Sequence, residues 1–218
     1  MACLLFFVKE DCSMRCIIIT PLYQGEELAW ITPGAEDLLI CADGGCSAAA
    51  AYGLEPHLII GDFDSLGSVP AGDNVIRLPV HKDDTDTVVC LREGRSRGYR
   101  EFIIAGGLGG RFDHTLSCLQ CAADGALRGE RIWICDERNR VTVLAPGEYR
   151  FEAMSGRKLS LLAYTSEVKG ITLKGALWEL ENASLTSNYP LGCSNEWTEE
   201  AARLSFREGL LTVCMSRD

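Results

Sequence analysis

The sequence predicts an α/β fold, a parallel sheet with helices on both faces, followed by a small antiparallel β domain. From residue 16 to about residue 136, short continuous apolar runs alternate with helical patterns, which is typical of buried strands joined by helices. After Ala145-Pro146-Gly147 the segments become short and alternate between apolar and polar residues, with glycine turns between them. The predicted domains are therefore residues 1–145 and 146–218.

In the first domain, apolar runs predict strands and helical patterns predict the connections between them. The strands are expected at Cys16–Thr20, Leu38–Cys41, Leu58–Ile60, Asn74–Arg77, Phe102–Ala105 and Arg131–Cys135. The helices are expected at Cys46–Tyr52, Thr85–Arg97 and Phe112–Leu127. In the last helix, apolar residues at helical spacing predict one helix face, made of Phe112, Leu116, Leu119 and Ala123.

In the second domain, short segments separated by turns such as Lys169-Gly170 predict an antiparallel arrangement. The strands are expected at Leu159–Tyr164, Ile171–Leu173, Leu177–Leu180, Leu204–Phe206 and Leu211–Val213. A domain of about 70 residues is near the lower limit of independent stability, so we expect it to pack on the first domain or on another subunit.

Composition and charge narrow the class of protein. The chain has 218 residues, and its net charge of −10 argues against non-specific binding to nucleic acid or anionic membranes. Its 11 scattered cysteines, without secretory features, indicate mostly reduced thiols in a cytoplasmic protein. Cys118-Leu119-Gln120-Cys121 lacks the partners of a zinc site and is a weak indication of a redox motif.

The start of the chain is interpreted as an extension that covers residues 1–15. The apolar segment Ala2–Val8 is too short to span a membrane and lacks a preceding basic region. Met14 directly precedes the first predicted strand and is therefore an alternative start.

Two short acidic blocks carry the strongest functional signal. Gly61-Asp62-Phe63-Asp64-Ser65 directly follows a predicted strand, and Lys82-Asp83-Asp84-Thr85-Asp86 opens a predicted helix. Carboxylates at a strand end and at a helix start can converge on one point, where they repel each other unless a hard cation such as Mg²⁺ joins them. The pattern therefore predicts phosphoryl-transfer chemistry on metal-bound phosphates.

Each acidic block also has a structural alternative. In an extended chain Asp62 and Asp64 project to the same side and face one cation, whereas an Asx turn would need only one of them. In the second block, Thr85 or Asp84 caps the helix, and Lys82 is either a phosphate contact or a solvated side chain.

Two glycine-rich turns follow strands at the same edge of the predicted sheet. In Cys41-Ala42-Asp43-Gly44-Gly45, Asp43 either caps a helix or stands where glycines let a ligand approach the backbone. The loop from Gly106 to His114 joins a strand to a helix, and its N–H groups together with Arg111 predict a phosphate cradle. The loop matches neither the P-loop nor the dinucleotide fingerprint, so it does not identify the phosphate compound.

In the second domain, the segment Leu191–Trp197 has the character of a recognition loop. Ser194 and Asn195 supply hydrogen-bond donors and acceptors, and Trp197 supplies a face for a flat or cationic ring. The alternative is an ordinary loop with one anchoring tryptophan.

Taken together and in this order, the motifs resemble those of the thiamine pyrophosphokinase family. The resemblance rests on Ala42-Asp43-Gly44-Gly45, Gly61–Ser65, Lys82–Asp86, the Gly106–His114 loop and Ser194-Asn195. It implies a Rossmann-like nucleotide domain followed by a β-sandwich domain, in a homodimer with the thiamine pocket at the subunit interface. It also implies the reaction: the hydroxyl of thiamine attacks the β-phosphorus of ATP, giving thiamine diphosphate and AMP in one step.

The resemblance further implies roles for individual residues. Mg²⁺ would be held by Asp43, Asp62, Asp64, Asp83 and Asp86. Lys82 and Arg111 would take negative charge, and Asp86 would accept the hydroxyl proton. ATP contacts would come from Gly44, Gly106, Gly107, Gly109, Gly110, Arg111, Asp113 and His114. The alternatives are that Asp113 contacts the metal or is only a first-turn acid of the helix, and that His114 is a structural histidine. The resemblance does not assign the adenine contacts, and Asp136 and Asn139 are candidates because they directly follow the last strand of the first domain. Thiamine contacts would come from Ser194, Asn195 and Trp197.

Two expectations follow from this assignment. Asp84 has no counterpart in the resemblance and is expected to cap the helix. Asp64→Asn is expected to abolish turnover and to leave the fold intact.

Two other functions remain open at this point. One is a Mg²⁺-dependent phosphatase with Asp62 as nucleophile and Asp64 as acid, which would release phosphate. The other is a sensor that binds thiamine or a nucleotide without turning it over. Formation of AMP that depends on thiamine would separate the predicted kinase from both.

Overall fold

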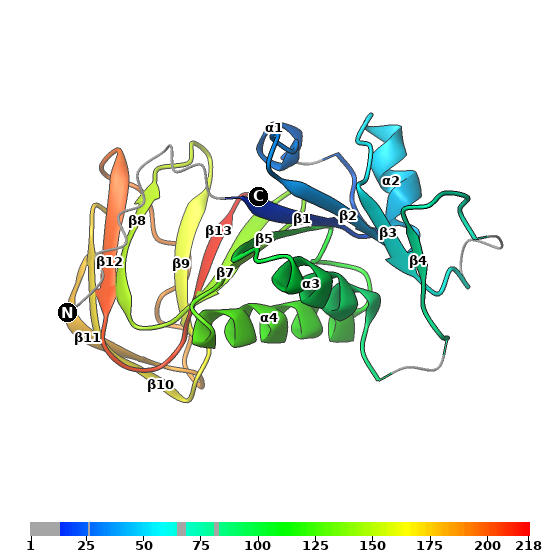
Figure 1. Cartoon of the computed structure of the whole chain (residues 1–218). Helices are drawn as coiled ribbons and strands as arrows, with labels where there is room; N and C mark the ends of the chain where they lie inside the picture. The colour runs from blue at the N-terminus through cyan, green and yellow to red at the C-terminus, as the bar shows by residue number, and fades with distance from the viewer. Residues whose placement is uncertain (1–13, 26, 65–68, 81–82) are drawn as a thin grey trace. The chain divides into compact units, whose positions relative to one another are not determined.

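The computed structural model describes residues 14–25, 27–64, 69–80 and 83–218, and it confirms an α/β part followed by an antiparallel β part (Figure 1). An α/β unit consists of the described residues of Ser13–Gly125 together with Glu130–Glu137, and a β unit consists of Ala126–Gly129 together with Arg138–Asp218. The units divide after Glu137, whereas the predicted domain boundary lies at residue 145. Among the described residues, no helix is long and apolar enough to cross a membrane.

The α/β unit is built on a parallel sheet whose strands match the predicted runs to within one residue at each end. The strands are β1 (Arg15–Ile19), β2 (Leu38–Ala42), β3 (Leu58–Gly61), β4 (Val75–Arg77), β5 (Glu101–Ala105) and β6 (Arg131–Cys135). They pair in the order β4-β3-β2-β1-β5-β6. The chain order reverses between β1 and β5, and parallel sheets bind ligands at such a switch point, outside the carboxyl ends of the strands.

Helices cover both faces of this sheet. The helices are α1 (Leu28–Ile31), α2 (Gly45–Ala51), α3 (Asp86–Ser96) and α4 (Phe112–Leu127). Figure 1 shows α1 and α2 on one side of the sheet and α3 and α4 on the other. The short helix α1 was not predicted, because four residues are too few for a periodic pattern.

The predicted apolar face of α4 is wrong at its amino-terminal end. Phe112 and Leu116 are exposed, whereas Ala123 is buried as predicted. Cys118, Ala122 and Ala126 are also buried and were not part of the predicted face. These small residues lie four apart on one helix face and allow α4 to pack closely. The prediction followed the large apolar side chains, Phe112 and Leu116, whereas close packing of the helix buries the small ones.

The strands of the β unit pair in two antiparallel groups. The strands are β7 (Asn139–Leu144), β8 (Gly147–Glu152), β9 (Lys158–Ala163), β10 (Glu167–Lys174), β11 (Leu180–Thr186), β12 (Ala201–Phe206) and β13 (Leu211–Ser216). Their orders are β7-β13-β9 and β11-β10-β12-β8. Alternate residues of β12 are buried, namely Ala202, Leu204 and Phe206, which gives this strand an apolar inner face.

One predicted strand of the β unit is wrong in position. Leu177 lies in the turn before β11, and the strand begins only at Leu180. The bulky residues Leu177 and Trp178 suggested a strand, yet both are more than half exposed. Strands β7 and β8 were not predicted, because the Pro146-Gly147 turn between them was interpreted as a domain boundary.

The buried carboxylate of Glu130, directly before β6, forms an ion pair with Arg95 in the last turn of α3. The side chain of Glu130 is 1% exposed and lies 2.8 Å from the guanidinium of Arg95, which also pairs with Asp124 at 3.1 Å. Arg100 contacts the other carboxylate oxygen of Glu130 at 3.2 Å. Removal of one member of a buried pair leaves uncompensated charge, which is costly.

We therefore expect Glu130→Ala to lower the free energy of unfolding by about 3 kcal/mol, measured by urea denaturation. Glu152→Ala is the matched control, since Glu152 pairs with Arg150 at 2.9 Å on the exposed surface. That control should cost less than about 1 kcal/mol. Equal losses from the two substitutions would show that the buried pair has no special role.

Candidate active site

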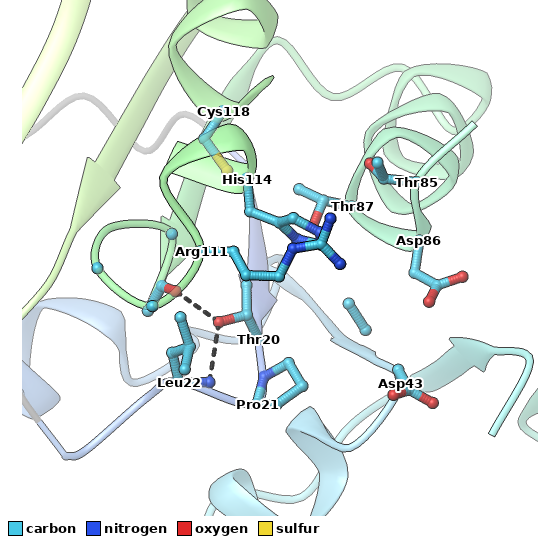
Figure 2. Close-up of a pocket in the computed structure, with 15 residues that line it drawn as sticks. Thr20, Pro21, Leu22, Asp43, Thr85, Asp86, Thr87, Arg111, His114 and Cys118 are labelled. Carbon is cyan, nitrogen blue, oxygen red and sulfur yellow. Dashed lines mark hydrogen bonds between the residues drawn. The ribbon is translucent and has the colours of Figure 1, made fainter. Parts of the chain in front are cut away.

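A cavity of about 270 Å³ lies at the carboxyl edge of the parallel sheet, at the switch point between β1 and β5 (Figure 2). It is lined by Thr20, Pro21, Leu22, Ala42, Asp43, Thr85, Asp86, Thr87, Gly106, Gly107, Gly109, Gly110, Arg111, His114 and Cys118. Figure 2 shows Asp43 and Asp86 on one side of the cavity and Arg111 and His114 on the other. The cavity therefore has an anionic side and a cationic side.

Three carboxylates from three different elements come together at the anionic side, where Asp43 and Asp86 line the cavity and Asp62 lies beside them. Asp43 follows β2, Asp62 follows β3 and Asp86 is the first residue of α3. One oxygen of each lies within 4.8 Å of the others, and all three side chains are half-buried. Carboxylate oxygens at this spacing suit a hard divalent cation.

Asp43 is positioned by its backbone and by a neighbouring strand. It has a left-handed φ of 47° and donates its N–H to the carbonyl of Ile60 at 2.8 Å. Its Oδ1 accepts a hydrogen bond from the N–H of Phe63 at 3.1 Å. The cap of α2 is Gly44, with no side-chain cap bond, so the alternative that Asp43 caps this helix is wrong.

Asp62 and Asp64 do not lie on one side of an extended chain, and that expectation is wrong. Phe63 between them has a φ of 61°, which turns the chain. The N–H of Asp64 then folds back onto Oδ1 of Asp62 at 3.3 Å, in an Asx turn. Asp62 joins the carboxylate group, whereas Asp64 is exposed and lies outside that group as found among the described residues.

The second acidic block is also divided by the structure. Thr85 caps α3 by accepting the N–H of Val88 at 3.3 Å. Asp84 instead lies 2.6 Å from Arg92, so its expected role as the cap is wrong. Asp83 is exposed and is not among the three grouped carboxylates of the described chain. Lys82 lies outside the described residues.

The glycine loop after β5 forms the floor of the cavity. Gly106 has a φ of 77°, and a Cβ there would lie 2.5 Å from the amide nitrogen of Tyr23. The hydroxyl of Thr20 donates to the carbonyl of Gly106 at 2.7 Å and accepts the N–H of Leu22 at 3.3 Å. The loop is thus fixed against the end of β1 and leads directly into the first turn of α4, where phosphate groups bind favourably.

Thr20, Pro21 and Leu22 line the cavity but were missed at the sequence level. Only its position could have identified Thr20 from the sequence, since it is the first polar residue after a buried strand at the ligand-binding edge.

Arg111 and Asp113 form an ion pair at the mouth of the cavity. The guanidinium donates to both carboxylate oxygens, at 3.1 and 2.6 Å, and both side chains are largely exposed. This hydrogen bonding lowers the pKa of Asp113, and Asp113 also accepts the N–H of His114 at 3.0 Å. The ion pair therefore fixes the guanidinium of Arg111 beside the cavity, and Asp113 contacts Arg111 directly.

The CxxC pair on α4 is not poised for redox chemistry. Burial raises the pKa of Cys118 to about 12 and also raises the pKa of Cys121, so both thiols stay protonated. We expect iodoacetamide at pH 8 to label the exposed Cys193 quickly and to reach Cys118 and Cys121 only after unfolding. Peptide mass spectrometry measures this; rapid labelling of Cys118, or a disulfide between the pair, would contradict it.

In the β unit, Trp197 lines a second hollow of about 320 Å³. Its indole Nε1 donates to the carbonyl of Arg157 at 2.9 Å, which fixes the ring. The guanidinium of Arg157 is buried and donates to two backbone carbonyls, those of Arg138 and Met215. The hollow is lined by Ala153, Met154, Ser155, Gly156, Arg157, Lys158, Glu196 and Trp197.

The other two residues predicted to contact thiamine, Asn195 and Ser194, do not line this hollow. The buried Asn195 side chain donates to the carbonyl of Trp178 at 2.8 Å and accepts its N–H at 2.9 Å. Asn195 therefore fixes the turn before β11. Ser194 is exposed, and its N–H donates to the hydroxyl of Ser160 at 2.9 Å.

The remaining predicted contacts come from both units. Gly44 caps α2 beside Asp43. Of the two adenine candidates, Asp136 follows β6 in the α/β unit, and Asn139 is the first residue of β7 in the β unit. Their roles stay predictions.

Both units of the chain are similar to known proteins. The family model described as the thiamin pyrophosphokinase catalytic domain matches residues 34–134, and the one described as the thiamin pyrophosphokinase vitamin B1 binding domain matches residues 148–211. A curated relative, thiamine pyrophosphokinase of Bacillus subtilis, is 28% identical over 188 residues, which is 83% of this chain and 88% of the relative.

Solved structures agree with these matches. Thiamine pyrophosphokinase from Bacillus subtilis has a TM-score of 0.82 at 25% identity and covers 94% of this chain and 100% of its own. A thiamin pyrophosphokinase family protein from Enterococcus faecalis has a TM-score of 0.77 at 30% identity, with the same two coverages.

Proposed function

Because this chain belongs to the thiamin pyrophosphokinase family, we propose that it is a Mg²⁺-dependent enzyme in which the carboxylate group and the glycine loop act on ATP. The function that both family domains support is the transfer of the diphosphate group of ATP to the hydroxyl of thiamine, giving thiamine diphosphate and AMP. The observation that carries the proposal is the convergence of Asp43, Asp62 and Asp86 within 4.8 Å, with Asp43 and Asp86 lining the same cavity as the glycine loop.

The residues present fit Mg²⁺. Asp43, Asp62 and Asp86 offer hard oxygen ligands, and three carboxylates this close repel each other unless a cation neutralises them. Bound Mg²⁺ would neutralise charge on the phosphates of ATP. Asp64 and Asp83 are weaker candidates for metal ligands, because both side chains are exposed and neither belongs to the group of three carboxylates.

The cationic side of the cavity would hold the phosphates of ATP. The N–H groups of Gly107, Gly109 and Gly110 and the start of α4 favour anions. The N–H of Gly106 instead donates to the carbonyl of Cys135 at 2.8 Å, so Gly106 would contribute through the close approach that it allows. Arg111 adds a guanidinium that can bind phosphate through two hydrogen bonds. In the reaction, the thiamine hydroxyl would lose its proton to Asp86 and its oxygen would form a bond to the β-phosphorus. The bond between the β-phosphorus and the bridging α-phosphate oxygen would break, and AMP would leave with that oxygen. The chain's contribution is to orient the reactants and to neutralise charge.

The rival functions have less support. Both family models favour the kinase over the phosphatase, which needs neither a glycine cradle nor a thiamine-binding domain. Incubation with ATP and thiamine, with and without Mg²⁺, tests all three. The proposal expects AMP only when thiamine and Mg²⁺ are both present. Free phosphate without thiamine would support the phosphatase, and binding without turnover would support the sensor.

Trp197 is the proposed aromatic contact for thiamine. Loss of a stacking face costs about 1–3 kcal/mol, so we expect Trp197→Ala to raise the KM for thiamine about tenfold or more while the KM for ATP changes little. Steady-state kinetics with each substrate varied in turn measures this. Tyr164→Ala is the matched control, since Tyr164 is an exposed aromatic residue of the same unit and does not line the hollow. An equal rise in both KM values would count against stacking.

We also propose a cytoplasmic homodimer. Described cysteines such as Cys41, Cys90 and Cys118 form no disulfide, which fits a reducing compartment. In the β unit, the large apolar side chains of Trp178, Tyr189 and Leu191 are more than half exposed, which fits a surface that another subunit covers. Sedimentation equilibrium should give twice the monomer mass; a monomer that turns over thiamine would contradict the dimer.

A further inference from the structure

One residue beside the carboxylate group has an unusual backbone conformation. Among the described residues, the non-glycine residues with left-handed φ are Glu27, Asp43, Phe63, Asn182 and Ser194. For a bulky aromatic residue such as Phe63, a φ of 61° is a genuine outlier. Strained conformations persist only where the surrounding structure holds them, and they gather at functional sites.

Two separate contacts hold Phe63 in this conformation. Its side chain is 3% exposed and belongs to the core cluster that also contains Ala49, Leu54 and Ile59. Its N–H donates to Oδ1 of Asp43 at 3.1 Å. The angle φ sets the direction of the N–H relative to the side chain, so the two contacts together require the left-handed value.

The strand end beside Asp43 leaves little freedom for another arrangement. A Cβ at Gly61 would lie 2.7 Å from the Cα of Asp43, which means that the ends of β2 and β3 pass in direct backbone contact. The N–H of Asp43 donates to Ile60, and the N–H of Phe63 donates back to Asp43. Asp62 lies between these two bonds.

We infer that Phe63 is a positioning residue for the carboxylate group: its buried ring fixes the left-handed turn that places Asp62 beside Asp43 and Asp86. The same turn carries Asp64 out of the group and folds its N–H onto Asp62 at 3.3 Å. The ring does not contact the metal; it acts through the backbone. This inference rests on the proposed metal centre.

The test is metal binding rather than turnover. Mn²⁺ serves as the probe, and electron paramagnetic resonance of free Mn²⁺ gives its Kd for the folded full-length protein without ATP or thiamine. The variants are Phe63→Leu, which keeps an apolar anchor, and Phe63→Gly, which adopts a left-handed φ without strain but has no anchor. Phe102→Leu is the control, because Phe102 is a fully buried phenylalanine of β5 in the same unit.

We expect the Kd for Mn²⁺ to rise a few-fold in Phe63→Leu and more than tenfold in Phe63→Gly, and less than twofold in Phe102→Leu. A purely structural role for Phe63 would lower stability and leave the Kd of the folded protein unchanged. The inference is overturned if Phe63→Gly binds Mn²⁺ as tightly as the unsubstituted chain. If that variant does not fold, an unchanged Kd in Phe63→Leu overturns it. Absence of Mn²⁺ binding by the unsubstituted chain would overturn the metal centre itself and this inference with it.

Discussion

Asp62→Asn is expected to lower kcat by about a thousandfold while the protein stays folded. The substitution keeps the shape of the side chain and removes its negative charge. Asp62 is one of three carboxylates whose oxygens lie within 4.8 Å of each other. Loss of one charge would weaken the bound Mg²⁺ and leave the phosphate charge of ATP uncompensated in the transition state. Thiamine-dependent AMP formation measures the effect, and circular dichroism checks the fold.

Asp64→Asn is the matched control for this substitution. Asp64 is two residues away, has the same side chain and is exposed outside the carboxylate group. From this placement we expect it to lose much less activity than Asp62→Asn, although the sequence alone predicted complete loss at Asp64. The opposite ranking, with Asp64→Asn inactive and Asp62→Asn active, would contradict the structural assignment of the metal ligands.

Arg111→Ala is expected to lower kcat for diphosphate transfer by about a hundredfold or more. The guanidinium of Arg111 lines the cavity on the side opposite Asp43 and Asp86. There it can neutralise charge that moves onto the phosphate oxygens during transfer. Steady-state kinetics with saturating thiamine measures the loss, which should fall mainly on kcat.

Asp113→Asn tests the role of Arg111 by removing the negative charge that pairs with it. Asp113 accepts two hydrogen bonds from Arg111, so it competes with the phosphates of ATP for the guanidinium. Solvent screens an exposed ion pair and makes it weak, so the KM for ATP should fall by less than about fivefold. A large rise in this KM would show instead that Asp113 contacts the nucleotide or its metal, as the sequence suggested.

Much of the fold followed from the sequence, because its strongest signals are local. The buried strands of the parallel sheet are continuous apolar runs, such as Ile17–Ile19 within β1, and their ends fall within one residue of the predicted ones. Because strand ends of a parallel sheet meet at one edge, the convergence of Asp43 and Asp62 could also be predicted.

The details that sequence reasoning missed depend on packing. No local pattern indicates that Phe63 adopts a left-handed φ, yet this angle decides that Asp62 and not Asp64 joins the group. In α4, the exposed Phe112 follows the helical spacing as well as any core residue, and only the sheet selects the small residues for burial. The structural role of Asn195 depends on its closeness to Trp178, which is distant in sequence.

The central claim is that this chain moves a diphosphate group from ATP to thiamine, and ³¹P nuclear magnetic resonance of the products tests it most directly. With ATP, thiamine, Mg²⁺ and the full-length chain, we expect thiamine diphosphate and AMP to appear in equal amounts and at equal rates. Formation of ADP, thiamine monophosphate or free phosphate in place of this pair would contradict the claim.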